Sequence, residues 1–374
     1  RDHRESRGLG DVYKRQGSTW AFDVKRRTDG TIEKYKARLC AQNLSQILGS
    51  DYNVTYPNTV DFSTLRALFS VAASRNYVLS GADIQTAYLS GLLEKGTTLY
   101  MEQAKGQEIS VDGDRLICKL NRSIYGLKQS GPCWGNLLDE HLTKMGFSRS
   151  VFDPCLYKIE KDTGILYMCV YIDDLCMASS TPEIRKEIMD ELRKTFEIKD
   201  TGELTWIFGT AIHQDLAKGT ISVSQKLYAE DTVRRLQGTI EKLSTSHNWS
   251  VPSTDDIIRL EELKERELVD PDYQSILGKV GWLSNISRPD LAYTYSMLFQ
   301  HSEEGDERHI ICLTNALMYI NETTGYEIVY QRGGCGILHK SISSASKLKC
   351  NALHDESLIT VSYTHLRAHE THDD

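Results

Sequence analysis

Two adjacent aspartates between two apolar runs are the feature that most constrains the fold of this chain. Residues 167–179 read YMCVYIDDLCMAS, which predicts a β-hairpin with Asp173 and Asp174 at its tip. A desolvated carboxylate is costly unless it is paired, and two neighbouring carboxylates also repel each other. A divalent cation relieves both costs, so the pair fits two-metal phosphoryl transfer. For the dipeptide alone, the ordinary alternative is a solvent-exposed Asp-Asp turn of type I′.

Composition indicates a globular protein with an uneven charge. The chain has 374 residues, 40% of them hydrophobic and 26% charged, which suits a few domains of about 150 residues each. The net charge of −8 argues against a uniformly basic nucleic-acid-binding domain. Residues 25–38 are nevertheless rich in Lys and Arg, whereas residues 255–270 are rich in Asp and Glu. The sequence is therefore compatible with a basic groove inside an acidic protein.

The cysteines and the apolar segments indicate an intracellular protein. The nine cysteines show no C-x-x-C motif and no spacing with His that suits zinc, as expected for free thiols in a reducing compartment. No apolar stretch reaches the roughly 18 residues of a membrane helix, and no signal peptide is recognisable. The sequence therefore predicts neither secretion nor association with a membrane.

The two ends of the chain look foreign to the rest. Residues 4–16 and 361–371 resemble peptides translated from sequencing-adaptor DNA, and neither shows clear amphipathic periodicity. We therefore expect residues 1–16 and 361–374 to lie outside the fold.

The pattern between these ends predicts an α+β fold with a small antiparallel sheet. Residues 20–39 indicate a hairpin with a basic face, a helix begins at Phe62, and residues 77–84 form a strand that carries Asp83 near its end. This order would bring Asp83 close to Asp173 and Asp174 at neighbouring strand ends. The other predicted elements are strands at 99–102, 116–120 and 155–159, helices at 134–146 and 182–196, a hairpin at 205–224, an acidic linker at 253–272, and helices at 273–287, 288–300 and 307–322.

Five segments in a fixed order resemble a known family. They are YKAR at 35–38, DIQTAYLSG at 83–91, SIYGLKQ at 123–129, YIDD at 171–174 and SRPDLAY at 287–293. Together they closely resemble the motifs of copia-type LTR retrotransposon reverse transcriptases. The resemblance implies a right-hand polymerase, with fingers and palm in residues 17–225 and with a thumb and helical connection segment in residues 226–330.

The same resemblance implies which side chains carry the reaction. Asp83, Asp173 and Asp174 would hold two Mg²⁺ ions, with Mn²⁺ as an alternative. Lys36 and Arg38 would grip the triphosphate of the incoming deoxynucleotide. The remaining implied roles are exclusion of the ribose 2′-hydroxyl by Tyr88, contact with the nucleotide and the templating base by Gln129, and positioning of the primer by Phe208 and Gly209 within residues 206–213.

These residues also have ordinary structural interpretations. An aspartate at a strand end, such as Asp83, often caps a turn. Solvated strand faces commonly carry cations, and a tyrosine or tryptophan near a helix is often part of the core. The ordinary interpretations are therefore a solvated face for Lys36 and Arg38, an exposed helix start for Gln129, and core packing for Tyr88 and Trp134.

The chain departs from the family pattern in three places. Gly135 follows Trp134 where an aromatic residue often stands. The stretch CAQN at 40–43 replaces a more basic, glycine-containing segment that would strengthen the grip on the template. Residues 331–360 show no acidic cluster of the ribonuclease H domain that normally follows, so we expect an unassigned remnant there and a fragment of a longer polyprotein.

The resemblance implies an RNA-directed DNA polymerase. Its partners would be an RNA template, a DNA primer, deoxynucleoside triphosphates and the integrase, protease and ribonuclease H parts of the full element. The family places such a protein in a cytoplasmic particle and in the nucleus. The alternative is a decayed, non-catalytic remnant that binds nucleic acid. A metal-dependent phosphatase or nuclease would use similar acids, but would not explain the segments around Tyr88 and Gln129.

Overall fold

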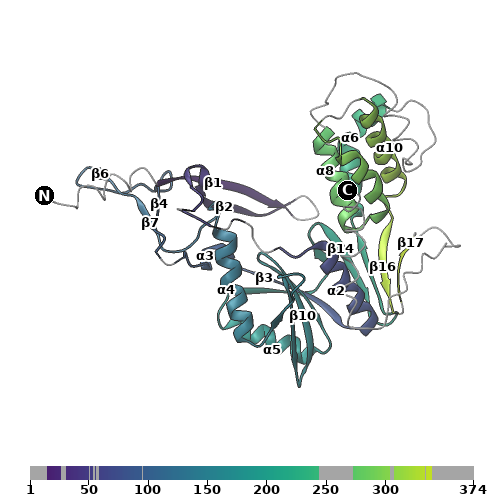
Figure 1. Cartoon of the computed structure of the whole chain (residues 1–374), viewed down its shortest axis with the longest axis horizontal. Helices are drawn as coiled ribbons and strands as arrows, with labels where there is room; N and C mark the ends of the chain where they lie inside the picture. The colour runs from purple at the N-terminus through teal and green to yellow at the C-terminus, as the bar shows by residue number, and fades with distance from the viewer. Residues whose placement is uncertain are drawn as a thin grey trace, which may run out of the picture. The chain divides into compact units, whose positions relative to one another are not determined.

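The chain forms two compact units in a computed structural model (Figure 1). The first unit falls within Arg1–Asp61, Gly81–Met177 and Thr181–Gly202, and the second within Phe62–Ser80, Ala178–Ser180 and Glu203–Asp374. The structure describes residues 15–26, 31–49, 51–53, 55, 59–94, 96–243, 273–303, 307–332 and 334–338.

A long two-stranded hairpin dominates the N-terminal part of the first unit. It consists of β1 (Arg15–Arg26) and β2 (Ile32–Gln42), which pair antiparallel with Trp20 opposite Leu39, Phe22 opposite Ala37 and Asp23 opposite Lys36. Because side chains alternate along a strand, one face is aromatic and the other carries Lys36 and Arg38. The predicted hairpin with a basic face is therefore confirmed, while residues 27–30 between its strands lie outside the described residues.

The hairpin begins earlier than the sequence predicts. Strand β1 pairs in parallel with β4 (Leu99–Met101) through Arg15 and Gln16, and β4 pairs in turn with β7 (Cys118–Leu120). Gln16 is fully buried. The expectation that residues 1–16 lie outside the fold is therefore wrong for Arg15 and Gln16, because pairing with β4 gives their backbone groups partners.

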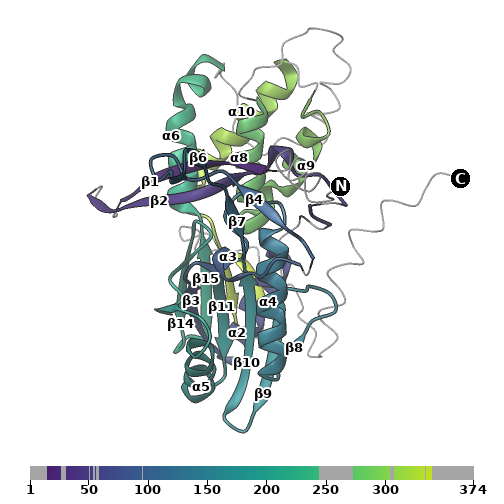
Figure 2. The ribbon, with the colours of Figure 1, turned by 90° about the vertical axis from the view of Figure 1, so that its left-hand side faces the viewer.

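A six-stranded sheet forms the centre of the first unit (Figure 2). The strand order is β12 (Ile198–Glu203), β3 (Val78–Ile84), β11 (Asp174–Ser179), β10 (Gly164–Tyr171), β9 (Leu156–Lys161) and β8 (Ser148–Arg149). Strands β8, β9 and β10 pair antiparallel in succession. Short elements complete the unit: η1 (Asn43–Ser45), α3 (Ala87–Ser90), β5 (Ser110–Val111) and β6 (Asp114–Arg115).

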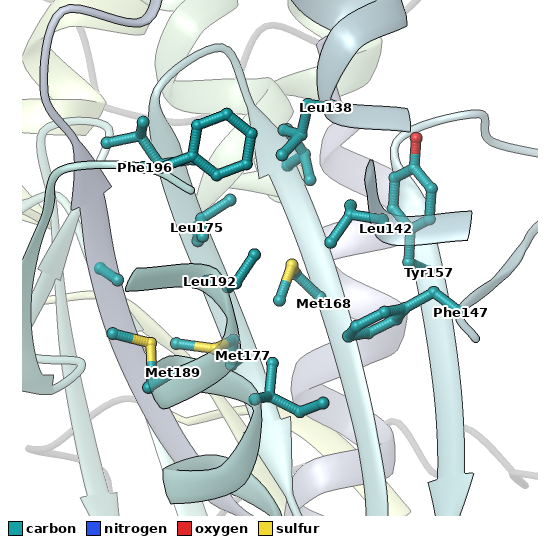
Figure 3. Packing of buried hydrophobic residues seen from close by; sticks show 14 of the residues in the cluster. Leu138, Leu142, Phe147, Tyr157, Met168, Leu175, Met177, Met189, Leu192 and Phe196 are labelled. Carbon is teal, nitrogen blue, oxygen red and sulfur yellow. The ribbon is translucent and has the colours of Figure 1, made fainter. Parts of the chain in front are cut away.

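Two helices cover one face of this sheet. The helix α4 (Ser130–Lys144) and the helix α5 (Pro182–Arg193) place apolar residues at helical spacing against every second residue of the strands (Figure 3). The Thr181 hydroxyl caps α5 by accepting from the Ile184 amide at 3.4 Å. The buried residues of this core include Ala82, Ile84, Trp134, Leu138, Leu142, Leu166, Met168, Leu175, Met177, Ile188, Leu192 and Phe196.

The second unit combines a five-stranded sheet with a group of helices. The strands are β13 (Trp206–Ile207), β14 (Thr210–Asp215), β15 (Thr220–Ser224), β16 (Glu327–Gln331) and β17 (Gly334–Leu338), in that order across the sheet. The helices are α2 (Phe62–Arg75), α6 (Lys226–Leu243), α8 (Tyr273–Ile286), η2 (Pro289–Leu291), α9 (Ala292–Phe299) and α10 (Glu307–Glu322).

The sheet of the second unit corrects two boundaries. Strands β16 and β17 form within segments predicted to be helical or left unassigned, because β16 pairs with β15 from far upstream. Residues 203–225 also belong to this unit, together with Phe62–Ser80 and Ala178–Ser180, so the predicted domain of residues 17–225 is divided between the two units. The predicted acidic linker at 253–272 lies outside the described residues.

The SRPD segment forms a buried ionic centre in the second unit. Arg288 is 2% exposed, and its guanidinium donates to the Asp290 carboxylate at 2.8 Å and to the Thr323 carbonyl at 3.1 Å. The rings of Tyr319 and Tyr326 lie 5.4 Å and 5.0 Å from the guanidinium carbon. A planar, permanently charged guanidinium can satisfy all these partners at once, whereas an ammonium group cannot.

Two expectations from composition can be compared with the described residues. The seven cysteines whose side chains are described form no disulfide bond within the described part of the chain. Among the helices of the described ranges, none is both long and apolar enough to span a membrane.

Candidate active site

The acidic tip predicted from the sequence is a tight turn between β10 and β11. The turn residues are Ile172 and Asp173, while Asp174 is the first residue of β11. Ile172 has a φ of 60°, and Asp173 is not among the residues with positive φ. These signs are those of a type II′ turn, so the type I′ Asp-Asp turn considered above does not form.

Asp83 approaches this turn from the neighbouring strand. Strand β3 lies beside β11, and the Ile84 amide donates to the carbonyl oxygen of Asp173 at 2.8 Å. The Asp83 carboxylate accepts a hydrogen bond from the Gln85 side chain. Asp83 therefore lies at a strand end beside the turn, as the order of elements predicts, and the side chains of Asp83, Asp173 and Asp174 are all half-buried.

Burial and neighbouring negative charge raise the proton affinity of Asp173 and Asp174. Burial, followed by the charges of Asp173 and Asp83, raises the pKa of Asp174 to about 6. Burial is also the largest cause that raises the pKa of Asp173, and the charge of Asp83 adds to it. Negative charge is thus concentrated here at a cost that a bound cation would relieve.

The donor set suits a hard divalent cation, although it is not arranged around one point. Within the described ranges, no three His, Cys, Asp or Glu side chains stand ready to hold a metal ion. Carboxylate oxygens are the ligands that Mg²⁺ prefers, and the raised pKa values show that nearby cations do not fully compensate their charge. Asp83, Asp173 and Asp174 are therefore the residues that would hold the metal.

Lys36 and Arg38 face the acidic turn from the basic side of the β1–β2 hairpin. Their positive charges act on Asp173 and partly offset the rise of its pKa. Both side chains are half-buried, and the Arg38 guanidinium carbon lies 5.7 Å from the ring centroid of Tyr125. Lys36 and Arg38 therefore do not lie on a freely solvated strand face. They place two positive charges near the carboxylates.

Tyr88 lies on α3 beside the same turn. The pKa of Tyr88 is raised by burial first and then by the charge of Asp173. Its ring packs edge-on against Tyr125, with ring centroids 5.3 Å apart. The Ser123 hydroxyl donates to the Tyr88 carbonyl and ties α3 to the SIYG segment. Tyr88 also borders the core of the first unit, so its structural and functional interpretations overlap.

Tyr125 is a site residue to which the sequence assigned no role. It connects two predicted nucleotide contacts, because its ring touches both Tyr88 and Arg38. In the sequence, only the position of Tyr125 in the SIYG segment, beside Gly126, indicates that it could lie at the site. Gly126 has a φ of 91°, and a Cβ there would lie 2.1 Å from the Ala41 carbonyl oxygen. Glycine therefore allows this segment to approach β2.

Gln129 is committed to internal hydrogen bonds. Its side chain is 6% exposed, donates to the Asp51 carbonyl at 3.0 Å and accepts from the Gln46 amide at 2.8 Å. The side-chain oxygen Oε1 of Gln46 in turn accepts from the Lys128 backbone amide at 2.9 Å. The exposed helix start considered above is therefore wrong. Contact of Gln129 with a nucleotide stays a prediction, and it would require rearrangement of this network.

A small hollow lies beneath the acidic turn. Its lining includes Tyr88, Trp134, Gly135, Leu138 and Ile172. Gly135, which departs from the family pattern, therefore lines the same hollow as the turn residue Ile172.

Comparison with known proteins agrees with this geometry. The sequence model of the reverse transcriptase (RNA-dependent DNA polymerase) family matches residues 9–245. This chain belongs to the reverse transcriptase family. The match spans most of the first unit, including all three carboxylates, and it confirms the resemblance to copia-type retrotransposon enzymes stated above.

Relatives of this reverse transcriptase chain are proteins of transposons. It is 30% identical over 324 residues to the retrovirus-related Pol polyprotein from transposon RE1 of Arabidopsis thaliana, covering 86% of this chain and 21% of the relative. It is 27% identical over 308 residues to that from transposon TNT 1-94 of Nicotiana tabacum, covering 82% and 23%. The putative transposon Ty5-1 protein of Saccharomyces cerevisiae is 29% identical over 253 residues, covering 67% and 79%. The chain thus spans about a fifth of the plant polyproteins.

Phe208 and Gly209 belong to the second unit of this reverse transcriptase chain. They form the two-residue turn between β13 and β14, with φ values of 50° and 72°. The Phe208 ring packs edge-on against Phe62 at 6.1 Å. The predicted hairpin at 205–224 is confirmed by the pairing of β14 with β15. The role of Phe208 and Gly209 in positioning a primer stays a prediction.

Proposed function

We propose that this chain is an RNA-directed DNA polymerase domain of a copia-type retrotransposon polyprotein. It would extend the 3′-hydroxyl of a DNA primer on an RNA template with deoxynucleoside triphosphates. The observation that carries the proposal is the Ile84–Asp173 hydrogen bond, which brings Asp83 to the turn where burial and neighbouring carboxylates raise the pKa of Asp173 and Asp174. A cluster of this kind suits two-metal nucleotidyl transfer.

In this proposal each side chain has a distinct task. Asp83, Asp173 and Asp174 bind two Mg²⁺ ions, or Mn²⁺ in their place. When bound, such ions lower the pKa of the primer hydroxyl and neutralise charge on the triphosphate. Lys36 and Arg38 attract and orient the triphosphate, since they already face Asp173. Tyr88 closes the space that a ribose 2′-hydroxyl would need.

The same proposal assigns parts of a right-hand polymerase. The β1–β2 hairpin would belong to the fingers, and the six-stranded sheet with α4 and α5 would be the palm. Phe208 and Gly209 would position the primer, and the helices from α6 onward would form the thumb and connection segment. The full element would add integrase, protease and ribonuclease H, and it would act in a cytoplasmic particle and in the nucleus.

Primer extension tests the proposal directly. We expect incorporation of dTTP on poly(rA)/oligo(dT) with Mg²⁺, and complete loss of incorporation in Asp173→Asn. Asp190→Asn is the matched control, because Asp190 is an exposed acid on α5. No incorporation by folded wild-type protein would overturn the proposal. Salt-dependent nucleic-acid binding without incorporation would instead support the decayed remnant.

A further inference from the structure

Trp134 contacts the acidic turn through its indole nitrogen. The side chain is 2% exposed and packs edge-on against Phe196, with ring centroids 5.4 Å apart. Its Nε1–H donates to the carbonyl oxygen of Ile172 at 2.6 Å. The expected core position is confirmed. Phenylalanine could fill a similar place in the core, but it has no N–H group and could not make this hydrogen bond.

The turn that Trp134 contacts is conformationally unfavourable. Ile172 has a φ of 60°, where a β-branched side chain crowds its own backbone. Glycine is the usual residue at this position of a type II′ turn. Such a conformation persists only where the surrounding structure holds it in place.

Two hydrogen bonds hold the peptide units on either side of Asp173. Trp134 binds the carbonyl of Ile172, and the Ile84 amide binds the carbonyl of Asp173 at 2.8 Å. These carbonyls belong to the peptide planes that flank the Asp173 Cα atom. Fixing both planes fixes both backbone dihedrals of Asp173, and therefore the direction of its Cα–Cβ bond.

We infer that Trp134 is a positioning residue that orders the Ile172–Asp173 turn and thereby aims the Asp173 carboxylate. The helix α4 and the strand β3 thus hold the turn from two separate elements. The consequence for metal binding rests on the proposed function, whereas the ordering of the turn does not.

Hydrogen exchange of the full chain tests the ordering without any reaction. Trp134→Phe removes the indole N–H and keeps a buried ring. We expect exchange in residues 167–177 to accelerate by about five-fold, the typical effect of losing one hydrogen bond. Phe196→Leu is the control, because it perturbs the same core but leaves the Trp134 hydrogen bond in place. Unchanged exchange of this segment in Trp134→Phe would overturn the inference.

A second variant makes the test independent of overall folding. Ile172→Gly removes the crowding at positive φ, so the turn should depend less on Trp134. We expect the Trp134→Phe/Ile172→Gly chain to fold with wild-type exchange in residues 167–177. The contrary result is that Trp134→Phe accelerates exchange by the same factor in the Ile172→Gly background as in the wild-type background. That result would show that Trp134 does not act through this turn.

Mn²⁺ titration connects the turn to the proposed site. We expect Trp134→Phe to raise the Kd for Mn²⁺ by about five-fold and Ile172→Gly to restore it in the double variant. If exchange responds but even the wild-type chain binds no Mn²⁺, the positioning role stands and the proposed function fails. If the wild-type chain binds Mn²⁺ and Trp134→Phe changes neither exchange nor Kd, the inference fails while the proposed function stands.

Discussion

The amide of Ile84 and the carbonyl of Asp173 form a hydrogen bond of 2.8 Å between two strands that are distant in sequence. Because Asp83 directly precedes Ile84, this main-chain bond sets how close the Asp83 carboxylate lies to the turn. The proximity of the acids is therefore built into the backbone of the sheet. Their mutual repulsion is a cost that the folded chain bears until a cation binds.

Asp174→Asn should stabilise the metal-free protein above neutral pH. The pKa of Asp174 is raised from 3.8 to about 6, so the folded state holds its proton more tightly than the unfolded chain. The stability linked to this proton is full below about pH 4 and is lost as the pH rises through about 6. We expect a gain of up to about 2 kcal/mol at pH 8 and none at pH 4, by urea unfolding with EDTA. Equal effects at both pH values would contradict this cause.

Tyr125→Leu should weaken discrimination against ribonucleotides. The edge-on contact of Tyr125 restrains the Tyr88 ring, and such aromatic pairs contribute about 0.5–1.5 kcal/mol. We expect the ratio of kcat/KM for dATP over ATP to fall by roughly three-fold, and further in Tyr88→Val. Phe147→Leu provides the control, since it removes an edge-on contact with Tyr157 elsewhere in the same core. An unchanged ratio in Tyr125→Leu would show that Tyr88 is held by other contacts.

Gly126→Ala should destabilise the first unit far more than Gly106→Ala. Both glycines have positive φ, at 91° and 86°, so both variants incur the backbone cost of about 1–2 kcal/mol. Only at position 126 would the new Cβ meet a backbone atom, the Ala41 oxygen at 2.1 Å, while nothing lies within 4 Å at position 106. The difference between the losses of unfolding free energy in the two variants measures the cost of this contact. Equal losses would mean that β2 can move aside.

Asp290→Ala should destabilise the second unit by about 3–5 kcal/mol, because it leaves the buried Arg288 charge without its carboxylate. Chemical unfolding of the full chain measures this loss. Glu140→Ala breaks an exposed pair with Lys144, which solvent screens, and should cost far less stability than Asp290→Ala. Similar losses in the two variants would show that the Thr323 and tyrosine contacts compensate the Arg288 charge.

Much of the first unit could be predicted because its signals are local. Alternation of apolar residues predicts the strands around Asp83 and Asp173, and helical spacing predicts α4 and α5. The turn itself was placed one residue too late, since Asp-Asp is a better isolated turn than Ile-Asp. Hydrogen bonds from Trp134 and Ile84, which come from distant segments, override that local preference.

The remaining differences also arise from distant partners. Strand β16 forms because β15 offers it an edge, which no pattern within residues 327–331 specifies. Gln129 has the sequence context of a substrate contact, yet Gln46 and Asp51 occupy its amide. The motif predicts where such a residue lies along the chain, whereas burial decides which groups it can offer.

The pairing of β1 with β2 limits how this region can change in length. Lys36 and Arg38 share one side of the ribbon only because they are two positions apart, with the aromatic rings on the reverse. Inserting or deleting a single amino acid ahead of Lys36 would turn both cations away from Asp173 and bring Ala37 to that side instead. Natural indels in this ribbon should therefore come in even steps, or be offset by a bulge that restores the phase.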